Sequence, residues 1–120
     1  MKKRLKNISN DLDASWFSIF ALDSVEYYQP DLINEFYDCE INNPIIRKLA
    51  IEKIALPYFN RLDSPNQDGF KQVLVEALTY TNEELRDAFD SAGLVFKKSI
   101  QDPHAFLVDL WNIVFPDQKQ

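Results

Sequence analysis

Apolar residues recur every three or four positions along most of the chain, which is the spacing of α-helices. In the C-terminal half, one helix is expected before the capping pattern of Thr81 and Glu84, and another after it. Gly93 suits the residue that follows this second helix, and Asp102 with Pro103 starts a third that Pro116 ends. The expected core stripes are Phe70, Val73, Leu74, Ala77 and Leu78; Leu85, Ala88 and Phe89; and Phe106, Leu107, Leu110, Trp111 and Val114.

Prolines and cap residues divide the N-terminal half into three expected helices. The first runs from a cap at Asn10 or Asp11 to about residue 28, and the second opens after Pro30. The third begins with Asn43 as its cap and is kinked or ended by Pro57. The apolar positions expected to face the core are Leu12, Trp16, Ile19, Phe20 and Val25, then Leu32, Ile33, Phe36 and Tyr37, then Ile46, Leu49, Ala50 and Ile54.

Two segments lack a helical stripe. Residues 63–69 form the longest polar stretch and are predicted to be the main loop. Residues 94–100 fit either a turn of helix or an extended segment, since a lone strand would have nothing to pair with. The sequence therefore predicts one all-α domain over residues 1–120, with a flexible basic tail at residues 1–9. Its five to seven helices would form a bundle or a short stack of helical pairs.

Composition narrows the function classes. A formal net charge of −6 disfavours nucleic-acid binding, because contacts to phosphate dominate that affinity. No apolar run approaches the roughly 20 residues of a membrane span. The basic start is followed by Asp11 and Asp13 before a short apolar run, which is unlike a signal peptide. With a single cysteine, Cys39, the chain is expected to be a soluble cytoplasmic protein.

Residues that could carry catalysis are scarce. His104 could act as a base with Asp102 as its orienter, but no nucleophile can be placed beside it. Cys39 lies between Asp38 and Glu40, whose charges oppose formation of a thiolate. One histidine and one cysteine do not make a zinc site, and two isolated glycines do not make a phosphate loop. We therefore expect no enzyme activity, no metal and no cofactor.

The strongest functional signal is a charge imbalance. Residues 7 to 46 contain no lysine or arginine, yet they contain eight acids. Such a run is often only a solvated helix face, but without compensating cations it also suits association with a basic protein. Tyrosines adjoin the acids, and tyrosine is enriched in protein interfaces. The residues expected to bind a partner are Asp23, Glu26, Tyr27, Asp31, Glu35, Asp38 and Glu40.

The acidic and aromatic stretch SVEYYQPDLINEFYDCE, residues 24–40, resembles small bacterial immunity proteins of contact-dependent growth inhibition systems. The size and acidity of the chain resemble them as well. The resemblance implies a cytoplasmic protein that binds a toxin domain, often a basic nuclease, and masks its active site. It assigns no individual residue. Two other readings stay open, namely an all-α adaptor that binds an apolar helix in a groove, and a hydrolase that uses converging carboxylates.

Overall fold

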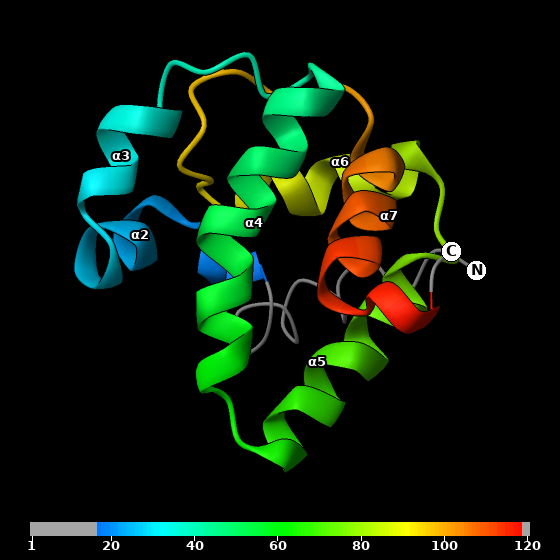
Figure 1. Ribbon diagram of the computed structural model, residues 1–120. Helices are drawn as coiled ribbons and strands as arrows, with labels where there is room; N and C mark the ends of the chain where they lie inside the picture. Colours follow the sequence, from blue (N-terminus) through cyan, green and yellow to red (C-terminus); the bar gives the residue numbers. More distant parts are fainter. Residues whose placement is uncertain (1–16, 119–120) are drawn as a thin grey trace.

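The computed structural model describes residues 17–118 and shows an all-α protein, as predicted (Figure 1). This part of the chain holds six α-helices and two short 3-10 turns, within the expected number of helices. They are η1 (Phe17–Phe20), α2 (Leu22–Tyr28), α3 (Asp31–Phe36), α4 (Pro44–Arg61), α5 (Ser64–Ala77), α6 (Asn82–Ser91), α7 (Pro103–Val114) and η2 (Pro116–Gln118).

The core is built around α7, which packs most extensively against α4 and also contacts α5 and α6. The predicted stripe of α7 is buried throughout. Rings from three other segments close on Phe106. Phe20 lies 5.1 Å from it between ring centroids, Phe89 lies 5.8 Å away and Phe96 lies 6.3 Å away. One aromatic centre therefore joins η1, α6, α7 and the segment that precedes α7.

The prediction of one unbroken first helix is wrong in its described part. Ala21 is extended, with ψ of 144°, and separates η1 from α2. The amide of Leu22 donates to the carbonyl of Gly93 at 2.9 Å, and the amide of Val95 donates to Phe20 at 2.8 Å. These partners from a distant segment replace bonds that a helix would have made. The predicted caps Asn10 and Asp11 and the apolar residues Leu12 and Trp16 lie outside the described residues.

The same contacts decide between the two conformations expected for residues 94–100, a turn of helix and an extended segment. Leu94 and Ala21 form an isolated antiparallel bridge, and the segment continues as bends with no helix. Val95, Phe96 and Ile100 are buried, so the segment is extended and packed into the core.

The predicted loop at residues 63–69 is also wrong, because α5 begins at Ser64. The Asp63 carboxylate accepts a hydrogen bond from the amide of Asn66 at 3.0 Å, and Pro65 lies in the first turn. These are the same start signals as at Asn43 and Asp102. The polar residues that suggested a loop lie mostly on the solvent side of the first two turns.

The start of α4 is confirmed, since the Asn43 side chain accepts hydrogen bonds from two amides of the first turn. The helix continues through Pro57 to Arg61. Its predicted stripe is partly wrong. Ala50 and Ile54 are buried, but Leu49 is exposed and Ile46 only half-buried. The core face is instead completed by Ile51, Ala55 and Phe59.

Other local predictions can be compared directly. The capping box of Thr81 and Glu84 is present, and Gly93 has φ of +64°. In α3 the face is confirmed through Phe36, but Tyr37 lies beyond the helix and is exposed. No helix in the described part of the chain has the length and apolar character that a membrane span requires.

Candidate protein-binding surface

The outer side of α2 carries an exposed aromatic ring. Val25 is buried and holds the helix to the core, which leaves Tyr27 on the opposite side with 79% of its surface exposed. The Tyr27 and Tyr28 rings meet edge to face, 4.7 Å apart. Tyr28 is backed by α4, because the guanidinium of Arg61 lies 5.3 Å from its ring centroid. Tyr28 thus supports Tyr27, whose ring remains free to contact another molecule.

The six described acids of residues 7 to 46 fall into two groups of three. In the first group, Asp23, Glu26 and Asp31 are exposed and form no ion pair with any residue between 17 and 118. We call Asp23, Glu26, Tyr27 and Asp31 the α2–α3 face. The other two predicted acids, Asp11 and Asp13, lie outside the described residues.

The second group is paired with lysines, and we call it the paired acids. Glu35 accepts from Lys53 of α4 at 2.8 Å. Asp38 lies 3.7 Å from the Lys97 ammonium, and Glu40 accepts from Lys98. All six side chains are substantially exposed, so each pair contributes little stability. The uncompensated charge of the described acids is therefore half of what the sequence suggests.

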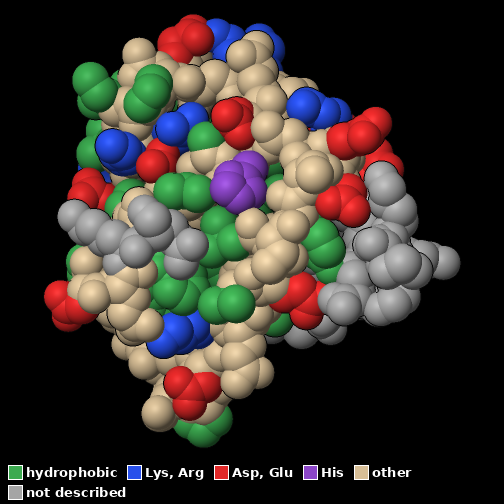
Figure 2. Space-filling view, turned by 90° about the vertical axis from the view of Figure 1, so that its right-hand side faces the viewer, with side chains coloured by type: hydrophobic (Ala, Val, Ile, Leu, Met, Phe, Trp, Pro, Cys, Tyr) green, Lys and Arg blue, Asp and Glu red, His purple; other side chains and the backbone are tan. Residues whose placement is uncertain are grey.

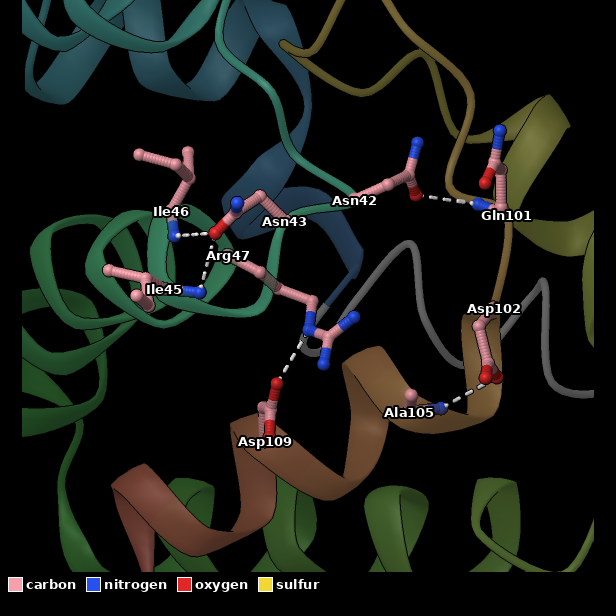
Figure 3. A network of polar contacts seen from close by, with 9 residues as sticks. All are labelled: Asn42, Asn43, Ile45, Ile46, Arg47, Gln101, Asp102, Ala105 and Asp109. Carbon is pink, nitrogen blue, oxygen red and sulfur yellow. Dashed lines mark hydrogen bonds and ion pairs between the residues drawn. The ribbon is translucent and has the colours of Figure 1, made fainter.

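A strap of chain at residues 37–43 carries two of these pairs and is fixed by further hydrogen bonds. The amide of Lys97 donates to the carbonyl of Tyr37 at 2.8 Å. The Asn42 side chain donates to the carbonyl of Ser99 and accepts from the amide of Gln101 at 2.8 Å (Figure 3). Asp38 and Glu40 therefore belong to a contact between two distant parts of the chain.

The single histidine has a structural environment rather than a catalytic one. It lies on the face shown in Figure 2, where acidic and basic side chains are interspersed. His104 Nε2 is 3.0 Å from the carbonyl oxygen of Leu78, which can only accept, so Nε2 carries the hydrogen. Asp102 does not orient the ring. Its carboxylate accepts from the amide of Ala105, and that hydrogen bond is the largest cause of its lowered pKa.

The other features that could support catalysis or ligand binding are the Cys39 thiol, possible metal ligands and a pocket, and none of them forms such a site in the described part of the chain. Burial is the main cause that raises the pKa of the Cys39 thiol, and the charge of Glu40 adds to it. Within residues 17–118, no three His, Cys, Asp or Glu side chains are grouped to hold a metal ion. A pocket of about 190 Å³ lies between Phe89 and residues 93–100, below the ~300 Å³ at which ordinary ligand pockets begin.

Comparisons with protein-family models, with curated proteins and with solved structures found no match to this chain. A function can therefore be proposed only from the surface and the residues that form it. Of the seven residues that the sequence suggested, Asp23, Glu26 and Tyr27 are exposed on α2 and Asp31 is exposed at the start of α3, whereas Glu35, Asp38 and Glu40 lie beside lysines. Sequence reasoning considered Lys53 as a cation that could neutralise these acids but missed Lys97 and Lys98, because each of the two lies more than fifty positions from its acid.

Proposed function

We propose that this protein is a non-enzymatic inhibitor of the toxin-immunity type, which binds a basic protein through its α2–α3 face. The supporting observation is the combination of an exposed tyrosine ring with three carboxylates that have no cation beside them in the described structure. A tyrosine buries a large flat area at little entropic cost, and free carboxylates attract lysine and arginine.

The positions of these residues suit a single contact. Asp23 and Tyr27 are four positions apart on α2, so they lie on the same side of the helix one turn from each other. Glu26 adjoins them, and Asp31 opens α3 after a short turn at Pro30. Asp23 and Glu26 therefore place negative charge beside the Tyr27 ring on α2, and Asp31 adds a further exposed carboxylate at the start of the next helix. Such a surface raises the rate at which a positively charged protein associates, and salt weakens the effect.

The paired acids have a secondary part in this proposal. A cationic partner gains less from Glu35, Asp38 or Glu40, because a lysine of the same chain already lies beside each one. They belong at the rim of the interface. The centre of the proposed interface is therefore the α2–α3 face, which contains four of the seven residues expected from the sequence.

The test begins with the toxin activity that the proposal requires. The proposal expects a toxin gene beside the gene of this protein, and co-expression of the protein with the toxin domain found there should restore growth. Association is then measured by stopped flow over a salt series. The triple variant D23N/E26Q/D31N should associate about tenfold more slowly at low salt, with a flatter salt dependence, because steering is lost.

The chain supplies its own matched control. The variant E35Q/D38N/E40Q removes the same formal charge from the paired acids and should slow association less. Equal effects from the two variants would argue against the α2–α3 face as the centre of the interface. If wild type and both triple variants associate equally fast and independently of salt, the result would favour the adaptor hypothesis instead.

A further inference from the structure

The outward side of α4 carries apolar residues that the core does not use. Ile45 is 77% exposed and Leu49 is 38% exposed. Glu52 and the half-buried Leu56 continue the same line, although Leu56 also packs against the core cluster. The spacing of the four residues is four, three and four, which is the a/d spacing with which one helix packs along another. We call this line the α4 seam.

The charges beside the seam are balanced, unlike those of the α2–α3 face. Arg47 is occupied by Asp109, and Lys53 by Glu35. Lys48 and Glu52 remain, and neither has an ion pair or side-chain hydrogen bond within the described structure. The seam thus presents one free cation and one free anion on an exposed helix that stands in the foreground of Figure 1.

From this arrangement we propose that the α4 seam binds a second copy of this chain, with the two α4 helices antiparallel about a two-fold axis. If the axis passes at the level of residue 50, Lys48 of each copy is level with Glu52 of the other. This two-fold axis places each side of one α4 helix next to the same side of the α4 helix in the other copy. Lys48 of one copy therefore lies next to Glu52 of the other. Ile45 then lies beside Leu56 of the other copy, and the two Leu49 side chains meet at the centre.

Charge complementarity favours a second copy at this surface. The chain has a formal net charge of −6, so most contacts between two copies are repulsive. At the seam the same symmetry that brings like surfaces together pairs opposite charges. One helix face is a small interface, so we expect a weak and reversible dimer.

Sedimentation equilibrium over a concentration series tests the proposal on the full chain. Wild type should show a monomer–dimer equilibrium, and Ile45→Glu should abolish it by placing a charge in the seam. Lys48→Glu and Glu52→Lys should each weaken dimerisation about fivefold, because two like-charged contacts replace two attractive ones. The double variant K48E/E52K should recover it, because the pairs are restored in reverse.

Val75→Glu is the matched control, since Val75 is an exposed apolar residue on α5. It should leave dimerisation unchanged, and circular dichroism of every variant should report an intact helical fold. The proposal is overturned by a protein that stays monomeric at all concentrations. It is also overturned if V75E acts like I45E, or if the double variant dimerises no better than the single ones. None of these results bears on the α2–α3 face, which lies on other helices.

Discussion

Gly69 and Gly93, the two glycines of the chain, lie in different backbone conformations. Gly69 is inside α5, where glycine is a poor helix former, and a Cβ built there meets no atom within 4 Å. Gly93 follows α6 with φ of +64°, a conformation that costs other residues about 1 kcal/mol. The same substitution should therefore have opposite effects at the two sites.

We predict that Gly69→Ala raises the free energy of unfolding by about 0.5–1 kcal/mol, because alanine loses less entropy in a helix. Gly93→Ala should lower it by about 1 kcal/mol, because alanine is strained at positive φ. Urea denaturation of the two variants beside wild type measures both effects. Destabilisation by G69A would contradict the open helical environment described for that position.

Single residues were also where the sequence was most informative. Asn43, Thr81 and Asp102 were all expected to cap helices, and each does. A cap acts on amides two or three positions away, so all the information it needs is local. Asp63 makes the same contact, but the polar residues after it suggested a loop. The error came from judging residues 63–69 by polarity, although exposed helical turns are polar as well.

At the scale of elements, the main connection between α4 and α7 includes a buried ion pair. Arg47 Nε donates to the Asp109 carboxylate at 2.5 Å, and the two side chains are only 13% and 12% exposed (Figure 3). Each charge has lost most of its water and depends on the other. Removing one partner is therefore much more costly than removing both.

We predict that Asp109→Ala lowers the free energy of unfolding by about 2–3 kcal/mol, since it leaves the Arg47 charge partly buried and unpaired. The double variant R47M/D109L, which fills the space with apolar atoms, should be closer to wild type than D109A is. Urea denaturation of all three proteins decides this. If the double variant is the least stable of the three, the pair contributes more than the mutual neutralisation of its charges.

Elements with local start and stop signals were predictable, and elements fixed by distant partners were not. The helices after Asn43, Thr81 and Asp102 follow from neighbouring residues. The break at Ala21 does not, because it depends on hydrogen bonds to Gly93 and with Val95. Similarly, the apolar pattern of α4 could not show whether Leu49 or Ile51 faces the core, because that depends on where α7 packs.

For the whole molecule, the distribution of charge matters more than its total. The sequence correctly indicated a region rich in acids and poor in cations, but not which acids would be free. Lys53, Lys97 and Lys98 come from α4 and from the segment before α7. Only the folded arrangement brings them to the paired acids. The candidate site could therefore be predicted as a region but not as a set of residues.

We predict that the two triple variants differ in stability as well as in binding. D23N/E26Q/D31N should lose less than the other variant, because its acids form no ion pair within residues 17–118 and only Asp23 and Asp31 gain the small stabilisation of a first helical turn. E35Q/D38N/E40Q should lose about 1 kcal/mol or less, as expected for exposed ion pairs, and the loss should fade in high salt. Thermal unfolding at low and high salt measures this. Greater destabilisation by the first variant would show that its acids have a role in the fold.

The contacts of the strap have a consequence for how the protein is made. Asn42 cannot form its hydrogen bonds before Ser99 and Gln101 are synthesised, and Glu40 cannot pair before Lys98 is synthesised. Each of these partners follows more than fifty residues later in the chain. The aromatic centre likewise lacks Phe106 until α7 has been synthesised. A nascent chain that stalls near residue 93 can already form the contacts of α2 and α3 with α4, such as Glu35 with Lys53, but it still lacks the partners of the strap.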